Sequence, residues 1–105
     1  MARLRSVIAF QVHPGREAEF EAAFEAARML SRPNQVDGFT GAELIRCLDE
    51  PTHYMVLGGW SSEAAYREWQ GRSIQDAPVE ALQRLFATLT DPSPGRIFSV
   101  VASSH

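Results

Sequence analysis

Apolar residues change their spacing along the chain in a way that predicts alternating strands and helices. Residues 3–12 (RLRSVIAFQV) contain a continuous apolar run led by β-branched residues, which is typical of a strand. The HPG segment at 13–15 predicts a turn, because proline fixes φ and glycine follows it. From residue 16 the apolar positions recur three and four apart, which predicts an amphipathic helix ending before Pro33, near Ser31.

The rest of the pattern predicts three more strands and a second helical region. A strand at 36–48 is followed by a turn at 49–52 and a strand at 53–60. Ser61 or Ser62 then caps a helix that loosens at 71–73, and a helix restarts at 76–78 and continues to 89. The last strand lies at 96–103. The order β-α-β-β-α-β is the ferredoxin-like arrangement of the α+β class. Its helices lie on one face of an antiparallel sheet.

The predicted strands are apolar on both faces of this sheet. A sheet with one solvated face should alternate apolar and polar residues. Residues 7–10, 55–57 and 100–102 are instead apolar at consecutive positions. Since the chain's own helices cover only one face, we expect a homodimer in which two sheets pack face to face.

Composition narrows the class of protein. A chain of 105 residues, 45% of them hydrophobic, is expected to form one globular domain over residues 1–105. The net charge is -3 and the chain has no basic cluster, which argues against a nucleic-acid partner. No apolar run approaches the roughly 20 residues of a membrane span, and the first run stops at Gln11, which is too early for a signal peptide. The single cysteine, Cys47, favours a reducing, cytoplasmic setting.

The sequence holds no pattern typical of a metal or cofactor site. His13 and His53 lie in or beside turns and His105 ends the sequence, so none has a metal-ligand spacing. The Gly58-Gly59 pair is not followed by the glycine and lysine of a phosphate-binding loop. Cys47 is best explained as a small buried apolar residue. We therefore expect neither a metal nor a cofactor.

The aromatic residues with polar tips are concentrated in one stretch. Residues 54–69 (YMVLGGWSSEAAYREW) contain both tryptophans and both tyrosines of the chain. They either fill the core or line a pocket. Tryptophan and tyrosine each carry a polar group that needs a partner when buried, and Gly58-Gly59 leaves space beside Trp60. An apolar pocket with a few hydroxyl or N–H donors suits a flat phenolic ligand.

Three motifs that follow one another along the chain add to this interpretation. They are F-x-V-x-P-G-x-E-x-E-F at 10–20, GFTGAEL at 38–44 and W-S-S-E-A-A-Y-x-x-W at 60–69. With them the chain resembles the antibiotic biosynthesis monooxygenase domains of the dimeric α+β barrel superfamily. Members of that family either oxidise anthrone-like phenols to quinones with O2 and no cofactor, or bind and degrade haem.

The resemblance implies the quinone-forming chemistry on a small aromatic or polyketide-derived phenol. In such relatives a tryptophan at the strand end and a tyrosine six residues later line the substrate pocket, and Trp60 and Tyr66 match both. An asparagine four residues before that tryptophan is replaced here by Val56. The expected catalytic residues are Trp60 and Tyr66, and the expected substrate-binding residues are Val56, Trp69, Arg46 and Arg72, with either arginine as a source of positive charge.

Other functions on this scaffold remain open. Haem degradation is not expected, because the strand-one asparagine of those relatives falls on Ile8 and their histidine region reads DAPVEAL. A barrel that binds a small hydrophobic ligand without oxidising it is one alternative. An isomerase or cyclase is another, since a fold does not fix a function.

Overall fold

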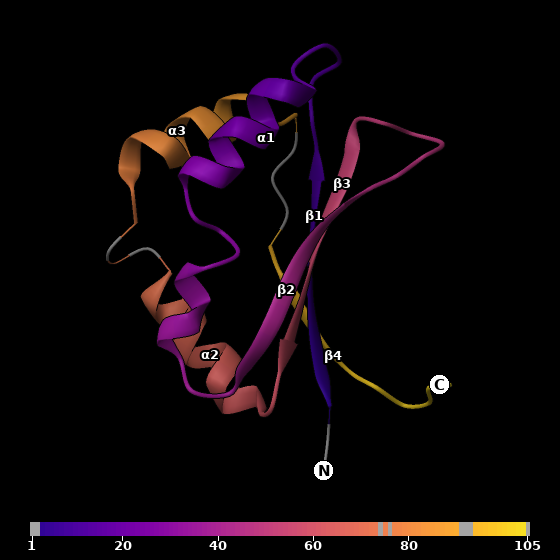
Figure 1. The fold of residues 1–105 in the computed structure, drawn as a ribbon, viewed down its shortest axis with the longest axis vertical. Helices are drawn as coiled ribbons and strands as arrows, with labels where there is room; N and C mark the ends of the chain where they lie inside the picture. The colour runs from indigo at the N-terminus through magenta and orange to yellow at the C-terminus, as the bar shows by residue number, and fades with distance from the viewer. Residues whose placement is uncertain (1–2, 74, 76, 91–93, 105) are drawn as a thin grey trace.

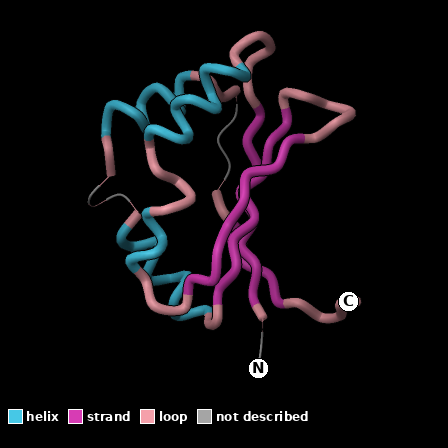
Figure 2. The backbone as a smooth tube through the Cα atoms, in the orientation of Figure 1, coloured by secondary structure: helices cyan, strands magenta, loops and turns pink. Residues whose placement is uncertain are grey.

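The protein folds as a four-stranded antiparallel sheet with helices on one face (Figures 1 and 2). The structure is a computed structural model, and it describes residues 3–73, 75, 77–90 and 94–104. Its elements are β1 (Leu4–Gln11), α1 (Glu17–Ala26), the 3₁₀ helix η1 (Arg32–Gln35), β2 (Phe39–Arg46), β3 (His53–Trp60), α2 (Glu63–Arg72), α3 (Val79–Ala87) and β4 (Arg96–Ser99). This order confirms the predicted ferredoxin-like α+β fold.

The sheet has the strand order β2-β3-β1-β4. Its register sets Val56 of β3 opposite Ile8 of β1 and Leu44 of β2. Because side chains alternate along a strand, Ile8 and Phe10 point toward the helices, whereas Val7 and Ala9 lie on the opposite face. Figure 1 shows α1 and α3 over one half of the covered face and α2 over the other half.

Two clusters of buried residues lie between the sheet and the helices. The closed cluster, under α1 and α3, consists of Phe10, Val12, Phe20, Ala23, Phe24, Tyr54, Val56, Leu85 and Leu89. The open cluster, beside α2, consists of Val36, Trp60, Ala65 and Tyr66, with Leu4, Phe39, Trp69 and Ile97 packed against it. The aromatic stretch noted in the sequence is thus divided, because Tyr54 belongs to the closed cluster and the other three residues to the open one.

The first helix ends earlier than predicted. It stops at Ala26 rather than near Ser31, although the apolar spacing continues beyond that point. Arg28 has a left-handed backbone with φ of 53°, so the chain leaves the helical path there. The chain then enters η1, whose Pro33 is buried. This early exit brings the connection toward α2 instead of extending α1.

The last strand is shorter than predicted. β4 ends at Ser99 rather than Ser103. Its one neighbour, β1, begins at Leu4, and Leu4 pairs with Ser99, so the ladder runs out of partners there. One further backbone bond follows, from Val100 N–H to the carbonyl oxygen of Arg3 at 2.8 Å, and Val101 is exposed.

Several expectations fall partly outside the described residues. These include part of the predicted loop at 91–95, the helix restart at Asp76, and His105. Within the described part of the chain, no helix has both the length and the apolar character needed to cross a membrane.

Candidate active site

A cavity of about 320 Å³ is lined by residues of the sheet, η1, α2 and α3. This volume is at the lower end of the roughly 300–1,000 Å³ usual for small-molecule pockets. The apolar wall includes Ile8, Met29, Phe39, Val56, Leu82 and Phe86. The groups that carry polar atoms include Ser6, Arg32, Trp60, Tyr66, Trp69 and Gln70. The cavity therefore combines an apolar interior with a small set of donors and acceptors.

Trp60 is held at the end of β3 by one hydrogen bond and one aromatic contact. Its indole N–H donates to Ser6 Oγ at 2.9 Å, across the β1–β3 pair. The ring of Phe39 lies 5.0 Å away, centre to centre. A β-carbon on Gly58 would lie 2.6 Å from Ser6 Oγ and 3.1 Å from Trp60 Nε1, so this glycine leaves the space that the hydrogen bond occupies. Because Ser6 accepts from Trp60, its own O–H proton is left to donate.

Tyr66 comes from the first turns of α2, whose start is fixed by a side-chain cap. Ser62 Oγ accepts a hydrogen bond from the Ala65 N–H at 3.1 Å. Of the two predicted caps, Ser61 and Ser62, the structure therefore has Ser62. The Tyr66 ring meets Trp60 edge to face at 5.6 Å. Gln70 Nε2 donates to the Tyr66 hydroxyl oxygen at 3.1 Å, and this leaves the hydroxyl proton available.

The ionisation of Tyr66 is shifted in the direction that favours a hydrogen-bond donor. Burial raises the pKa of Tyr66 above its ordinary value of 10.0, and the nearby Arg67 guanidinium opposes that shift in part. The residue therefore stays a neutral phenol at neutral pH. It can donate a proton in a hydrogen bond, but it is not a base.

Arg32 places a guanidinium in the cavity wall. It lies 5.2 Å from the centre of the Trp69 ring, and one of its N–H groups donates to the Ser73 carbonyl oxygen at 2.8 Å. The residue is only 8% exposed. Arginine buried this far is unusual unless it is paired.

The structure brings together four of the six residues expected from the sequence. Trp60, Tyr66, Val56 and Trp69 all line the cavity. Arg46 and Arg72 are not among the lining residues. They are half exposed, and both pair with carboxylates of helices.

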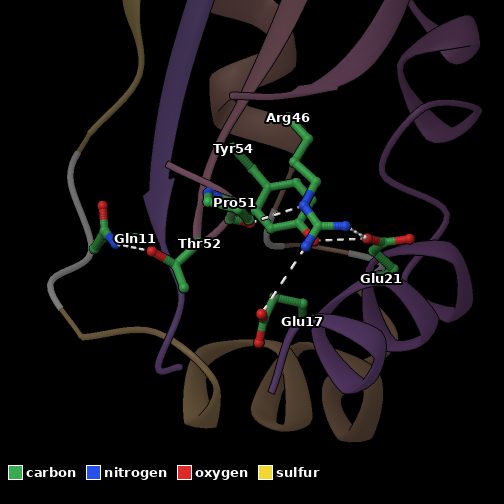
Figure 3. A network of polar contacts seen from close by, with 7 residues as sticks. All are labelled: Gln11, Glu17, Glu21, Arg46, Pro51, Thr52 and Tyr54. Atoms are coloured by element: carbon green, nitrogen blue, oxygen red, sulfur yellow. Dashed lines mark hydrogen bonds and ion pairs between the residues drawn. The ribbon is translucent and has the colours of Figure 1, made fainter. Parts of the chain in front are cut away.

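Arg46 lies at the other end of β2 and β3, in the polar network of Figure 3. Its guanidinium lies 3.9 Å from Glu17 Oε2 and 3.7 Å from Glu21 Oε2. Its Nε donates to the Pro51 carbonyl oxygen, and the guanidinium lies over the Tyr54 ring at 5.5 Å. Arg46 therefore joins α1 to the sheet. The cation inside the cavity is Arg32 instead.

Sequence reasoning missed Arg32, Ser6 and Gln70. Arg32 precedes a proline in a connection, where an arginine is usually solvated. Ser6 is one polar residue in an otherwise apolar strand, and such a residue on the covered face is a usable signal of a buried polar contact. Gln70 lies four residues after Tyr66 on α2, at a spacing that places both side chains on one face. That spacing was visible in the sequence.

No group of three or more His, Cys, Asp or Glu side chains in the described part of the chain is arranged to hold a metal ion. The described residues that line the cavity likewise include no carboxylate and no imidazole. Arg32 is the one charged side chain among them.

Fold and cavity together define a ferredoxin-like α+β domain with a mainly apolar internal cavity. The chain belongs to the antibiotic biosynthesis monooxygenase family, whose sequence profile matches residues 3–81. This membership confirms the resemblance found in the sequence motifs, and it supports a monooxygenase-type function.

Individual relatives agree with this assignment. The 42.8 kDa protein in the whiE locus of Streptomyces coelicolor is 32% identical over 81 residues, which cover 77% of this chain and 20% of that protein. The chain thus spans about one fifth of the length of that relative.

Solved structures resemble the whole chain. SnoaB, a cofactor-independent oxygenase from Streptomyces nogalater, is 23% identical, with a TM-score of 0.63 over 100% of this chain and 97% of that one. A Bordetella bronchiseptica protein, provisionally named an antibiotic biosynthesis monooxygenase, is 22% identical, with a TM-score of 0.70 over 99% and 100%. At these identities the likeness establishes the shared fold.

Proposed function

We propose that this protein is a cofactor-independent monooxygenase that oxidises a small aromatic, polyketide-derived phenol with O2. The observation that carries the proposal is the Trp60–Tyr66 pair, which lines an apolar cavity. Family membership supports it, as does the description of SnoaB as a cofactor-independent oxygenase.

The proposed reaction demands little of the protein, because the substrate supplies the electrons. When the CH2 of an anthrone becomes a carbonyl, one atom of O2 enters the product and the other leaves as water. The substrate loses all four electrons that O2 gains, and its two hydrogens leave with the water. The protein must bury the ring, favour its anion and admit O2. Apolar walls strengthen the few polar contacts by excluding water.

We propose that two hydroxyl groups, those of Tyr66 and Ser6, orient the substrate oxygens. Tyr66 keeps its proton and its oxygen is already held by Gln70. The Trp60 N–H, expected from the sequence to contact substrate, instead donates to Ser6. We therefore assign the direct contact to the Ser6 hydroxyl and give Trp60 the role of orienting it. Val56 contributes an apolar wall where relatives have an asparagine.

A non-catalytic ligand-binding barrel is the second candidate. It is favoured by the lack of any carboxylate or imidazole among the described residues of the cavity wall, which leaves no side-chain base there. An isomerase or cyclase would need such a base to move a proton. It is therefore less well supported by the site.

Oxygen uptake tests the proposal. The purified protein, with a chelator and no added flavin, is mixed with a polyhydroxylated anthrone. Wild type should consume O2 above the spontaneous rate and yield the quinone, whereas Trp60→Phe and Tyr66→Phe should be slower. Tyr66→Phe removes only the hydroxyl, and Trp60→Phe removes the N–H together with part of the ring. Uptake equal to the buffer blank in all three proteins would favour the binding barrel.

The helix-free face of the sheet supports a homodimer. Alternation along the strands places Val7, Ala9 and Leu57 on this face, and Ile45 and Phe98 are 39% and 45% exposed. Arg5, Glu43 and Arg96 share this face, so it is partly polar, and its exposed apolar side chains favour an interaction surface. We propose that two copies cover it by packing sheet to sheet.

Cytoplasmic location stays a prediction from the one free cysteine.

A charged substitution is expected to have different effects on the two faces of the sheet. Ala9→Glu, on the helix-free face, should give a folded monomer in sedimentation experiments, because it buries a carboxylate between the two sheets. Phe10→Glu should unfold the chain, because Phe10 lies in the closed cluster. A monomeric, well-folded wild type would contradict the dimer.

A further inference from the structure

We propose that Arg32 binds an anionic oxygen of the aromatic ligand, so that the cavity selects ring compounds that carry a carboxylate or a phenolate. The inference rests on the proposed site and deepens it, since it names the charge of the substrate. It comes from the surroundings of the Arg32 guanidinium, and it does not depend on catalysis.

The first observation is that the charge of Arg32 is buried without a counter-ion in the described part of the chain. The ion pairs found there involve five other arginines, and each of those pairs is at least partly exposed. Arg32 is 8% exposed, and it forms no such pair with a described carboxylate. A buried charge is costly unless an opposite charge or several hydrogen bonds compensate it. An anionic ligand would provide that compensation.

The second observation is that the backbone and one carbonyl hold the guanidinium in the wall. Arg32 begins η1, and its N–H donates to the Arg28 carbonyl oxygen at 3.0 Å. Its side chain donates to the Ser73 carbonyl oxygen just beyond the end of α2. The negative end of the helix dipole favours a cation there. The guanidinium is thus positioned before any ligand arrives.

The third observation is that this arrangement leaves binding capacity. A guanidinium has five N–H donors, and one side-chain hydrogen bond is found for Arg32 among the described residues. The geometry of the fork suits a carboxylate or another oxyanion. Trp69 lies against the same guanidinium and also lines the cavity, so a ligand ring beside Trp69 would lie near Arg32.

This role gives the site a way to favour a phenolate without a side-chain base. A cation beside a phenol lowers the pKa of the phenol, because it stabilises the ionised form. The ionised, electron-rich ring is the form that the proposed oxidation requires. A carboxylate substituent on the ligand would use the same contact for orientation instead.

A merely structural role for Arg32, as a cap of α2, makes a different prediction. Loss of a cap lowers stability and affects all ligands alike. Loss of an anion-binding group weakens the charged ligand and spares its neutral analogue. A matched pair of ligands therefore distinguishes the two roles.

The test is calorimetric binding of 2-naphthoate and 2-naphthamide, which have the same ring system and differ in charge. Arg32→Gln should weaken 2-naphthoate binding about tenfold to hundredfold and leave 2-naphthamide nearly unchanged. Arg32→Lys keeps the charge and should retain most of the preference. Arg84→Gln removes an exposed arginine of α3 and should behave as wild type. Thermal unfolding of each variant reports any loss of the cap.

A second arm distinguishes the two sources of the anion. Binding of 2-naphthol is measured from neutral pH to about pH 10, where phenols ionise. Affinity that rises with pH in wild type and not in Arg32→Gln indicates a phenolate site, whereas naphthoate discrimination alone indicates a carboxylate site. The proposal is overturned if wild type shows no preference for either anion, or if Arg32→Gln weakens charged and neutral probes equally. Neither probe needs to be oxidised, so these results stand apart from the oxygenase proposal.

Discussion

The closed and open clusters occupy the same face of one sheet, yet they use aromatic residues in opposite ways. In the closed cluster the Phe20 ring lies 5.4 Å from Phe10, 5.9 Å from Phe24 and 4.6 Å from Tyr54. In the open cluster Trp60 and Tyr66 contact each other at one side and border a cavity at the other. The rings of the closed cluster fill the core, whereas those of the open cluster form part of a cavity wall.

Polar atoms follow the same division. The Tyr54 hydroxyl donates to Glu21 Oε2 at 2.6 Å, so its proton is already committed to a protein partner. The Tyr66 hydroxyl accepts from Gln70, so its proton remains available. A buried tyrosine with its proton committed is part of the framework, and one with its proton available can bind a ligand. The two tyrosines are equally buried, so they differ in the direction of the hydrogen bond that each hydroxyl makes.

The largest expected effect is on stability and comes from a substitution in the closed cluster. Phe20→Ala should lower the free energy of unfolding by about 3–5 kcal/mol, because Phe20 is fully buried among three rings. Trp69→Ala in the open cluster should cost roughly 1–2 kcal/mol, because that side chain is only partly buried. Urea unfolding of both variants measures the difference. Equal losses would mean that the open cluster is packed as tightly as the closed one.

The next-largest effect concerns the pH dependence of stability, in which Tyr54 and Tyr66 should differ. Burial, then the hydrogen bond to Glu21, raises the pKa of Tyr54 from 10.0 to about 12. The folded state therefore holds this proton more tightly than the unfolded state. The resulting stability is fully present below about pH 10 and is lost as pH rises toward 12, by about 2–3 kcal/mol in total.

Urea unfolding between about pH 9 and pH 12 checks this prediction. Because the chain contains no lysine, few other groups titrate in this window. Tyr54→Phe should flatten the decline more than Tyr66→Phe does. A decline of the same steepness in Tyr54→Phe and wild type would contradict the assignment.

The smallest effect concerns the helix that carries the open cluster. Ser62→Ala should lower stability by about 1 kcal/mol, because it removes the cap of the Ala65 N–H. Ser61→Ala, at the neighbouring position without this cap, is the control. If calorimetric melting shows equal losses for the two variants, the cap is not at Ser62.

Most of the fold could be predicted from apolar spacing, because strands and helices impose different periods. The bounds of β3 match the prediction, and the α2 cap, Ser62, is one of the two serines predicted. The end of α1 did not, since the apolar pattern continues past Ala26 and only the left-handed backbone of Arg28 stops the helix. The end of β4 depends on where β1 begins, which is a tertiary fact.

The site was predictable in its aromatic part and not in its polar part. Trp60 and Tyr66 carry motif positions and polar tips, so they could be named from the sequence. The buried cation could not, because ten arginines are alike in sequence until the chain exit at Arg28 and η1 places one of them in the cavity. Arg46 was named as a source of positive charge for the site, but it pairs with carboxylates of α1.

The most direct test of the central claim, that the open cluster is an oxygenase site, compares two tyrosine variants. Tyr66→Phe and Tyr54→Phe each remove one tyrosine hydroxyl from the layer between the sheet and its helices. Anthrone-dependent O2 uptake should fall in Tyr66→Phe and stay near the wild-type rate in Tyr54→Phe under conditions where both are folded. Equal rates in the two variants, or a loss confined to Tyr54→Phe, would contradict the account.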